Sequence, residues 1–409
     1  MRILHCISQL PDHTGSGTIY KNLSGSGTHE IHKFRLIFGC NKSTKLQFPF
    51  LNYSCFTIDR EKTGFDLPGM SDIMPYTSSV FKEIDKAQIG NYKEILKSKL
   101  KEEIETFKPD IIWSHHLWIM TSVICDLAPN TPVIGFCHGT DLLQHKKCYE
   151  ISKEIKPKLK KLSAIVLNGP QQKKEVESLI NIKNFHFIGV PVNEDIFNIN
   201  MRYTSEKRTK INLCYAGKIS REKGVHHLLK SVINLIEKGF INLQLNIYGE
   251  GNLSELGEII KLADQYKNNI IFHGKVDQES LAKELQKNDL FILPSFYEGL
   301  GLVVIEALMS GCKVVCNKYQ NLMDILPPET IEQAYVKIVD CSVNLEDAKK
   351  LDFHEYTNSL TSAIEEQLNS DFGIQLSGKI SESVNSFKIS TYKKRLESLS
   401  YRLIEKGSA

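Results

Sequence analysis

Hydrophobic positions gather in short runs rich in β-branched residues, and these runs alternate with longer amphipathic stretches. This alternation is typical of parallel sheets whose strands are connected through helices. In the first half of the chain the predicted strands are Arg2–Ser8, Phe34–Phe38, Asp110–His115, Pro132–His138, Ala164–Leu167 and His186–Val190. Helices are predicted over Lys93–Phe107 and Lys153–Leu162, whereas residues 41–92 have weak periodicity and give no clear prediction.

After Pro191 the chain becomes polar and charged through residues 193–210, as in a linker between compact units. A second series follows, with predicted strands at Ile211–Ala216, Leu243–Tyr248, Ile270–His273, Leu290–Leu293 and Lys313–Cys316. Its predicted helices are Lys223–Ile236, Leu253–Gln265, Glu279–Gln286, Leu302–Met309, Tyr356–Gln367 and Ser386–Glu405. We therefore expect α/β units over residues 1–195 and 196–380, and a C-terminal helical segment, 381–409, that packs back across the domain junction.

Composition narrows the classes of function. The chain has 51 basic and 48 acidic side chains in 409 residues, so its net charge is only +3, and no dense basic block suggests a nucleic-acid surface. No long uncharged apolar stretch is present, and the apolar run Met1–Leu10 is too short for a signal peptide. These features predict a cytoplasmic protein that does not bind nucleic acid.

Metal-binding motifs are absent from the sequence. The ten cysteines contain no Cys-x-x-Cys pair, and the chain has neither His-Glu-x-x-His nor Asp-x-Asp. We therefore expect reduced cysteines and no metal in the mechanism.

The junctions between strands and helices are the natural places for chemistry, because ligands of doubly wound sheets bind beyond the carboxyl ends of the strands. The first junction carries Gly15 and Gly17, whose backbone could approach an anion, although an ordinary loop is an equal alternative. The second carries His138, which is either a structural histidine or one near a reacting centre. The third follows Gly217 and has three cations within six residues: Lys218, Arg221 and Lys223. Such clustering suits a diphosphate.

The fourth junction, Pro294–Gly311, follows a strand and starts a helix near Gly301. Backbone amides at the start of this helix would form an anion site. Glu298 and Glu306 would repel phosphate, so we expect both carboxylates to accept hydrogen bonds from sugar hydroxyls instead.

The Glu-x7-Glu element Glu298–Glu306, with Gly299, Gly301 and Ala307, resembles the signature of the family 4 retaining glycosyltransferases. The order and spacing of four further segments are also similar to that family: Gly217–Gly224, Leu245–Gly251, Phe272–Val276 and Asp289–Ser295. The resemblance implies the GT-B fold, in which two Rossmann-like doubly wound domains face a central cleft. The first domain would bind the acceptor and the second a nucleotide-sugar.

The resemblance also implies roles for individual residues. Glu306 would hold the ribose, Glu298 the transferred sugar, and Lys223 with Lys218 the diphosphate, while His138 would be the active-site histidine. The remaining donor-binding residues would be Gly15, Gly17, Gly217, Arg221, Gly249, Val276, Gly299, Leu300, Gly301, Leu302 and Val303. The implied reaction moves a sugar from a nucleotide-sugar, with a UDP-sugar favoured, to a hydroxyl of a glycan, lipid-linked or small-molecule acceptor. It would retain the anomeric configuration and need no cofactor or metal.

Two positions depart from the family pattern. Lys218 stands where the family usually has arginine, so the diphosphate would be held more loosely unless Arg221 compensates. Lys313 replaces a proline and Asn317 follows the same strand, which changes the expected donor pocket.

Other classes of function remain open at this stage. An NAD-dependent oxidoreductase would need a complete G-x-G-x-x-G motif, which the chain lacks. A sugar-nucleotide epimerase, a phosphorylase or a non-catalytic GT-B scaffold subunit would share the fold. A single lysine-rich helix expected over residues 145–162 is either a solvated face or, through residues 146–161, a weak contact for an anionic membrane surface.

Overall fold

The computed structural model divides into two compact units, Met1–Pro191 together with the chain from Tyr392 onward, and Val192–Thr391. The first division lies slightly before the expected boundary at 195/196, and the expected segment 381–409 is itself divided at Tyr392. The structure describes residues 1–11, 14–24, 32–45, 52–170, 172–182, 184–200, 210–296, 298, 300–340 and 354–407.

Unit 1 is built on a seven-stranded sheet with the order β3-β2-β1-β6-β7-β8-β9. Its strands are β1 (Arg2–Ile7), β2 (Lys33–Asn41), β3 (Tyr53–Ile58), β6 (Ile111–His115), β7 (Val133–Cys137), β8 (Ala164–Leu167) and β9 (Phe185–Phe187). All pairings between these strands are parallel. Every residue of β6, β7 and β8 is buried, which explains why β7 and β8 have no charged or strongly polar residue and why β6 begins with Ile-Ile-Trp.

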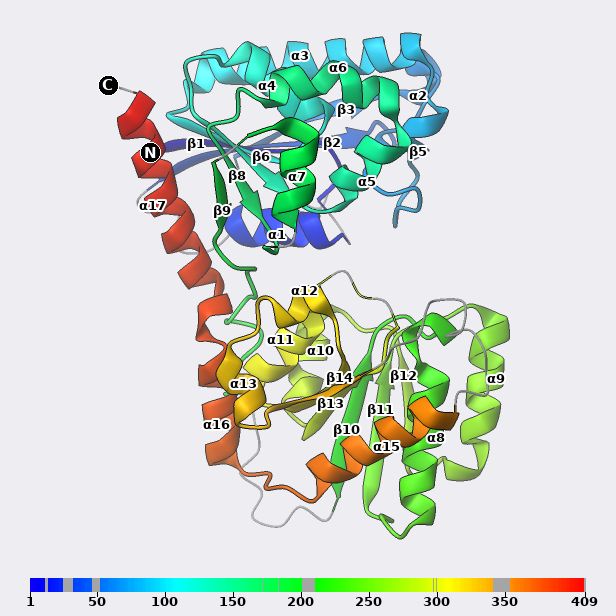
Figure 1. Ribbon diagram of the computed structural model, residues 1–409. Helices are drawn as coiled ribbons and strands as arrows, with labels where there is room; N and C mark the ends of the chain where they lie inside the picture. Colours follow the sequence, from blue (N-terminus) through cyan, green and yellow to red (C-terminus); the bar gives the residue numbers. More distant parts are fainter. Residues whose placement is uncertain are drawn as a thin grey trace. The chain divides into compact units, whose positions relative to one another are not determined.

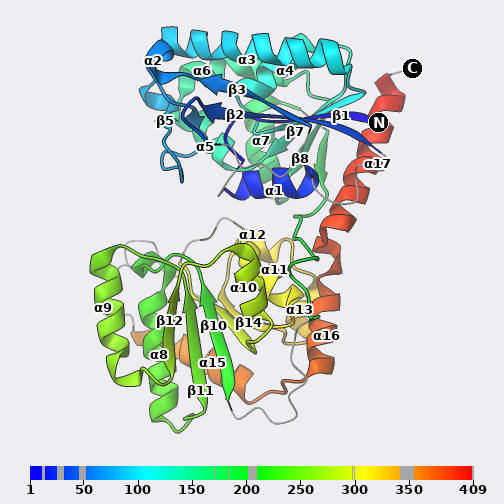
Figure 2. The same ribbon diagram turned by 180° about the vertical axis from the view of Figure 1, so that it is seen from behind.

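Helices cover both faces of this sheet. They are α1 (Gly15–Ser24), α2 (Arg60–Thr63), α3 (Lys86–Phe107), α4 (Ile119–Leu127), α5 (Thr140–Lys147), α6 (Tyr149–Leu159) and α7 (Gln172–Ile180). Helix α3 begins with a capping box, in which the Asp85 side chain accepts from the Gln88 amide and Gln88 accepts from the Asp85 amide. In both ribbon views α3 and α4 lie on one side of the sheet and α1 on the other (Figures 1 and 2).

The prediction of one lysine-rich helix over 145–162 is wrong, because the structure has two helices, α5 and α6, that meet at Cys148. The backbone of Cys148 has φ −118° and ψ 69°, outside the helical region. The buried His145 side chain fixes this break, since one ring nitrogen lies 2.8 Å from Leu117 O and the other 2.8 Å from Ser152 Oγ on α6. These contacts to distant segments are not visible in the local periodicity.

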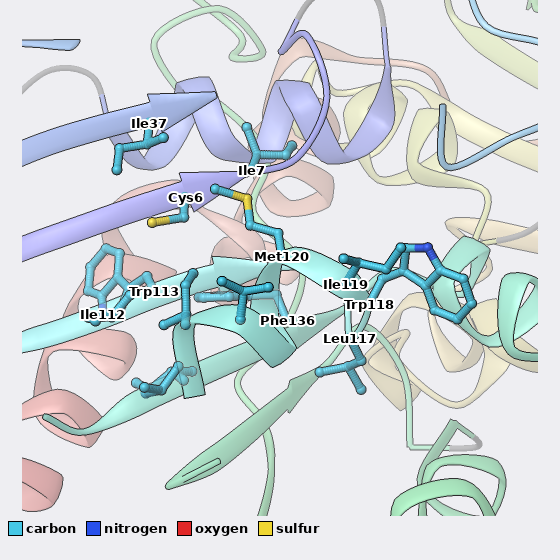
Figure 3. Close-up of a cluster of buried hydrophobic side chains, with 14 of the residues drawn as sticks. Cys6, Ile7, Ile37, Ile112, Trp113, Leu117, Trp118, Ile119, Met120 and Phe136 are labelled. Atoms are coloured by element: carbon cyan, nitrogen blue, oxygen red, sulfur yellow. The ribbon is translucent and has the colours of Figure 1, made fainter. Parts of the chain in front are cut away.

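The core of unit 1 forms where β1, β2, β6 and β7 meet the loop and helix after β6. Figure 3 shows Phe136 from the sheet and Met120 from the following helix near the centre of the cluster, with Trp113 and Trp118 on opposite sides of them. Each of these four side chains is at most 1% exposed.

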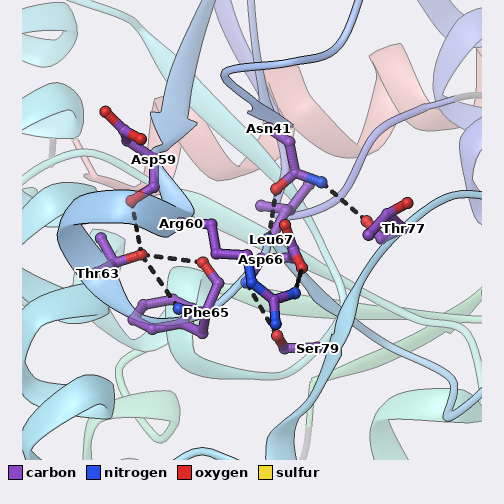
Figure 4. A network of polar contacts seen from close by, with 9 residues as sticks. All are labelled: Asn41, Asp59, Arg60, Thr63, Phe65, Asp66, Leu67, Thr77 and Ser79. Carbon is purple, nitrogen blue, oxygen red and sulfur yellow. Dashed lines mark hydrogen bonds and ion pairs between the residues drawn. The ribbon is translucent and has the colours of Figure 1, made fainter.

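Residues 41–92 had no clear prediction, and several of their described residues are held by side-chain hydrogen bonds to the backbone (Figure 4). Asn41 accepts from the Leu67 amide at 2.6 Å and donates to Thr77 O at 2.8 Å. The segment contributes a small two-stranded sheet of β4 (Pro68–Gly69) and β5 (Ser79–Val80). Arg60 forms an ion pair with Asp66 in the same network.

Unit 2 has a six-stranded parallel sheet with the order β12-β11-β10-β13-β14-β15. Its strands are β10 (Ile211–Ala216), β11 (Leu243–Tyr248), β12 (Ile270–Gly274), β13 (Leu290–Leu293), β14 (Lys313–Asn317) and β15 (Val336–Val339). Numbered within the sheet, this order is 3-2-1-4-5-6, the order of the doubly wound dinucleotide-binding fold. The first six strands of unit 1 follow the same order.

The helices of unit 2 are α8 (Val225–Glu237), α9 (Leu253–Ala263), α10 (Gln278–Leu285), α11 (Leu302–Met309), α12 (Gln320–Met323), α13 (Pro328–Glu332), α15 (His354–Leu368) and α16 (Ile374–Ser383). Helix α15 packs on α8, and α10 packs on α11 on the other side of the sheet (Figures 1 and 2). The last helix, α17 (Ile389–Gly407), starts in unit 2 and continues into unit 1. Across the described residues, no helix combines the length and apolar character needed to span a membrane.

Candidate functional site

The order of the sheet in unit 2 reverses at β10, which has β11 on one side and β13 on the other. Ligands of such sheets bind outside the carboxyl ends of the strands at this reversal. The loops that follow β10, β11, β12 and β13 are therefore the parts of unit 2 that position a ligand.

A pocket of about 310 Å³ lies at the carboxyl ends of β10, β11 and β12. Four residues predicted from the sequence line it: Gly217, Lys218, Gly249 and Val276. The other lining residues are Ala216, Tyr248, Glu250, Lys275 and Leu281, none of which was among the predicted site residues. Ala216 and Tyr248 end predicted strands, and Glu250 and Lys275 lie just beyond strand ends, so strand position is the signal that could have identified these four. Leu281 lies on α10 and had no such signal.

Two glycines let the backbones of neighbouring loops touch in this pocket. A Cβ on Gly249 would lie 1.8 Å from Gly217 O, and the Gly217 amide donates to Tyr248 O at 3.0 Å. Gly249 also has φ +145°, a conformation that other residues rarely adopt. The part of the pocket wall formed by Gly217 and Gly249 is thus bare backbone.

The cations after β10 have different surroundings. Lys218 is exposed and forms no ion pair with any described residue, while its carbonyl accepts from Tyr215 Oη at 2.7 Å. Arg221, which was expected to compensate for Lys218, forms an ion pair of 2.6 Å with Glu258 on α9. Of Lys218 and Arg221, only Lys218 lines the pocket and has no ion pair with a described residue.

Lys223 pairs with a residue from another loop. Its Nζ lies 2.7 Å from Glu298 Oε1, and the side chains are 26% and 19% exposed. The next residue, Gly224, makes this approach possible, because it has φ +66° and a Cβ there would lie 2.2 Å from Pro294 O. The Phe296 amide also donates to Glu222 O at 3.0 Å, which ties the two loops together.

Helix α11 begins at Leu302, as predicted, with Gly301 at its N-cap in the left-handed conformation, φ +67°. The amides of Leu302 and Val303 are in its first turn and have no partner within the helix by geometry. Leu300 lies just before this turn and is partly exposed. Gly299, which was also predicted to bind the donor, lies outside the described residues.

Glu306 lies on the same helix, where its Oε1 accepts from Gln278 Nε2 at 3.3 Å. Burial raises the pKa of Glu306 to about 7, and the hydrogen bond from Gln278 opposes this shift. Gln278 is the first residue of α10 and was not predicted from the sequence. A carboxylate with few protein partners is suited to accept from ligand hydroxyls.

The second departure from the family pattern has a structural explanation. Asn317 Nδ2 donates to Pro294 O and Ser295 O at 3.1 and 2.9 Å, and Tyr319 Oη donates to Leu293 O and Ser295 O at 2.9 and 2.8 Å. These two residues shape the loop that carries Glu298. Lys313 lies away from that loop, with its Nζ 2.5 Å from Ser370 Oγ.

The remaining predicted site residues belong to unit 1. Gly15 and Gly17 lie in the first turn of α1, and Gly17 has no room for a Cβ, which would lie 2.8 Å from the Pro11 carbonyl carbon. His138 directly follows β7 and precedes Gly139, the N-cap of α5. Its backbone amide donates to the buried Asp141 at 3.1 Å. Its ring Nε2 lies 2.8 Å from His115 Nδ1.

Many lysines of α5 and α6, and Lys161 just beyond, are neutralised within unit 1. Lys146 pairs with Glu175 at 2.6 Å, Lys158 and Lys161 pair with Asp126 at 2.8 Å, and Lys147 pairs with Asp72. This favours the solvated face over a membrane contact. Within the described ranges, no three His, Cys, Asp or Glu side chains gather as a metal site would require.

Comparison with known proteins finds a family similar to part of unit 2. Residues 197–336 match the family described as "Glycosyl transferases group 1". An uncharacterized glycosyltransferase of Methanocaldococcus jannaschii is 21% identical over 293 residues, which cover 66% of this chain and 74% of that protein. An uncharacterized 41.2 kDa protein of the cps region of Klebsiella pneumoniae is 30% identical over 146 residues, but these cover only 36% of each chain.

Solved structures match almost the whole chain. Sucrose-phosphate synthase from Thermosynechococcus elongatus is 16% identical with a TM-score of 0.68 and covers 99% of both chains. The catalytic domain of Arabidopsis thaliana starch synthase IV, bound to ADP and acarbose, has 14% identity, a TM-score of 0.65 and 99% coverage of both chains. Anabaena HepE in complex with UDP has 14% identity and a TM-score of 0.62, and covers 98% of this chain and all of its own. The fold is therefore GT-B, as predicted.

Proposed function

We propose that this protein is a family 4 retaining glycosyltransferase that moves a hexose from a nucleotide-sugar to an acceptor hydroxyl without a metal ion. The observation that carries the proposal is the 2.7 Å pair between Lys223 and Glu298. It joins the loops after β10 and β13, within the segment that matches the group 1 glycosyltransferases. A cation for the departing diphosphate is thereby held beside a carboxylate for sugar hydroxyls.

The donor would lie along the carboxyl ends of the strands of unit 2. The base would occupy the pocket between Gly217 and Val276, and Glu306 would accept from the ribose hydroxyls. The free cation Lys218 and the first amides of α11 would face the diphosphate. The similar Anabaena protein was solved in complex with UDP, which supports a UDP-sugar as donor. The similar starch synthase was solved with ADP, so the identity of the nucleotide base must be tested.

In the proposed reaction the acceptor oxygen bonds to the anomeric carbon as the bond from that carbon to the diphosphate oxygen breaks. The acceptor proton passes to the departing phosphate oxygen on the same face. Negative charge grows on the diphosphate during this step, so cations and amides that are already oriented toward it lower the barrier. Lys223, Lys218 and the start of α11 would supply this stabilisation.

A thermal-shift screen with UDP-, GDP-, ADP- and TDP-sugars tests the first step. A donor at 100 times its Kd should stabilise the protein by about 2.7 kcal/mol. The selected donor is then incubated with candidate acceptors in excess EDTA, and the anomeric configuration of the product is read by proton NMR. Transfer with retention supports the proposal. If EDTA abolishes transfer and magnesium restores it, the proposal that the reaction needs no metal is wrong.

The alternatives give different outcomes in the same screen. A sugar-nucleotide epimerase converts the donor when no acceptor is present, and a phosphorylase releases a sugar phosphate when inorganic phosphate is added. A scaffold subunit binds or ignores the donor but transfers nothing across the acceptor panel. Any of these results would contradict the proposed transferase activity.

A further inference from the structure

Four side chains of unit 1 form a continuous chain of hydrogen bonds that runs from the buried interior to the partly exposed His138. His5 Nδ1 lies 3.1 Å from Ser24 Oγ, His5 Nε2 lies 2.7 Å from His115 Nε2, and His115 Nδ1 lies 2.8 Å from His138 Nε2. Ser24, His5 and His115 are each 0% exposed. They come from α1, β1 and β6, and the last histidine follows β7, so the chain crosses three adjacent strands.

The rings are held in place by aromatic neighbours. The Tyr20 ring packs on His5 with centroids 4.3 Å apart, and Phe136 stacks on His115 at 4.6 Å with an angle of 4° between the rings. None of the three rings makes a hydrogen bond to a carboxylate in the part of the chain that the structure describes. Burial lowers the pKa of His5 and of His138 to about 3 and that of His115 well below its ordinary value.

All three histidines are therefore neutral at pH 7, and a neutral imidazole has one N–H donor and one lone pair. Each hydrogen bond in the chain then constrains the next one. If one ring donates from Nε2, it must accept at Nδ1, and the reverse also holds. The direction at one end of the chain fixes the direction at the other end.

Ser24 supplies that direction. Its hydroxyl donates to Tyr20 O at 2.8 Å, so its oxygen is left to accept from His5 Nδ1–H. His5 Nε2 is then a lone pair that accepts from His115 Nε2–H, and His115 Nδ1 accepts from His138 Nε2–H. This assignment leaves the lone pair of His138 on Nδ1. His138 Nδ1 has no hydrogen-bond partner among the described residues, and it is not one of the fully buried polar atoms that lack a partner.

We infer that Ser24, His5 and His115 are positioning residues that fix His138 in the tautomer with hydrogen on Nε2 and a lone pair on Nδ1. The ligand of His138 is then a hydrogen-bond donor. In terms of the proposed function, on which this part rests, that ligand is a sugar hydroxyl, because a neutral lone pair is repelled by phosphate oxygens. The sequence could not show this role, since the three contacts join residues 19, 110 and 23 positions apart.

The tautomers can be measured without any substrate. Nitrogen NMR of histidine-labelled protein at pH 7.5 distinguishes a ring nitrogen that carries hydrogen from one with a lone pair. Resonances are assigned with the variants His138→Asn and His115→Asn. We expect hydrogen on Nδ1 of His5, on Nε2 of His115 and on Nε2 of His138. Hydrogen on Nδ1 of His138 in the wild-type protein would overturn the inference, whatever the variants do.

Ser24→Ala removes the acceptor for His5 Nδ1–H, so the chain should reverse in part of the molecules. We expect two tautomers of His138 and a fall in kcat of about 3- to 10-fold, the value of one neutral hydrogen bond. Ser24→Thr keeps the hydroxyl and should restore both readouts. Ser152→Ala is the matched control, because Ser152 is a buried serine that contacts a different histidine, His145, at 2.8 Å. It should leave His138 and kcat unchanged.

The two proposals fail in different ways. An unchanged His138 tautomer in folded Ser24→Ala protein would contradict the positioning role even if sugar transfer is observed. The assigned tautomers, with the expected change in Ser24→Ala but no transfer from any nucleotide-sugar, would contradict the proposed function and leave the hydrogen-bond direction intact.

Discussion

Lys223 Nζ donates to Glu298 Oε1 over 2.7 Å, although the two residues are 75 positions apart. The family resemblance implied separate roles for them, with the lysine on the diphosphate and the glutamate on the sugar. Their contact means that each side chain orients the other. Removing the lysine would also leave a partly buried carboxylate beside the expected phosphate.

The first prediction concerns this pair. Lys223→Ala should lower turnover by about 2.7–4 kcal/mol, the cost of deleting one preorganised electrostatic group. The double variant Lys223→Ala/Glu298→Gln should lose less than the sum of the single losses, by about 0.5–3 kcal/mol, because the unpaired carboxylate is gone. Steady-state kinetics on the four proteins of this cycle measure the coupling.

Lys238→Ala is the control for that cycle. Lys238 pairs with Glu365 at 3.0 Å on the exposed side of α8 and α15, so its loss should leave turnover unchanged. Strictly additive effects of Lys223→Ala and Glu298→Gln would show that the ion pair has no part in catalysis.

The second prediction concerns Lys218, an exposed cation that lines the pocket. Lys218→Arg should keep or improve activity, because a guanidinium can bridge two phosphate oxygens. Lys218→Ala should reduce kcat/KM by less than Lys223→Ala does, by about 1–2 kcal/mol. The structure removes the expected rescue by Arg221, which already pairs with Glu258 at 2.6 Å. Activity in Lys218→Ala equal to that of the wild type would rule out contact with the diphosphate.

The third prediction concerns the pH dependence of Glu306. Burial raises its pKa from 4.5 to about 7, so between these values the folded protein binds a proton that the unfolded chain has released. Stability should therefore fall as the pH rises through this window. Glu306→Gln cannot ionise, so its stability relative to the wild type should increase from pH 5 to pH 8, by at most about 3 kcal/mol. Urea unfolding of both proteins at several pH values measures the difference.

Donor binding should show the opposite trend. Hydroxyls donate to the ionised carboxylate of Glu306, so affinity for the intact nucleotide-sugar should increase as the pH rises through 7, by up to about tenfold per pH unit below the pKa. Calorimetric titration of Glu306→Gln should give a weaker affinity with little pH dependence. A wild-type affinity that is flat from pH 5.5 to 8 would contradict the ribose assignment.

The fourth prediction concerns Gly224, which has φ +66° and lies against the Pro294 carbonyl. Gly224→Ala should destabilise unit 2 by about 1–3 kcal/mol and reduce activity, because the loops that carry Lys223 and Glu298 must separate. Gly257→Ala is the matched control, since Gly257 lies on α9 with open space around it. The Gly257→Ala variant should be more stable than the wild type by about 0.5–1 kcal/mol. Thermal unfolding of both variants measures these changes in stability.

The sequence alone determined the local elements. The strands Ile211–Ala216, Leu243–Tyr248 and Leu290–Leu293 and the helix Leu302–Met309 have the predicted bounds. Short apolar runs bounded by glycine and charged residues encode a buried parallel strand locally, and parallel strands bring their carboxyl ends to one edge. The loop residues Gly217 and Lys218 could therefore be assigned to a ligand site before the fold was known, whereas Gly249 was assigned through the family resemblance.

Only the tertiary structure decided which side chains meet. In the sheet β13 lies directly beside β10, so the loop that carries Glu298 reaches Lys223, although the two residues are distant in sequence. Arg221 instead forms its ion pair with Glu258. The break of the lysine-rich segment at Cys148 depends on contacts of His145 with Leu117 and Ser152. The local sequence around a histidine in an apolar strand is the same whether or not its ring is hydrogen-bonded to another histidine. The direction of the chain from Ser24 to His138 is therefore set by packing across strands that are distant in sequence.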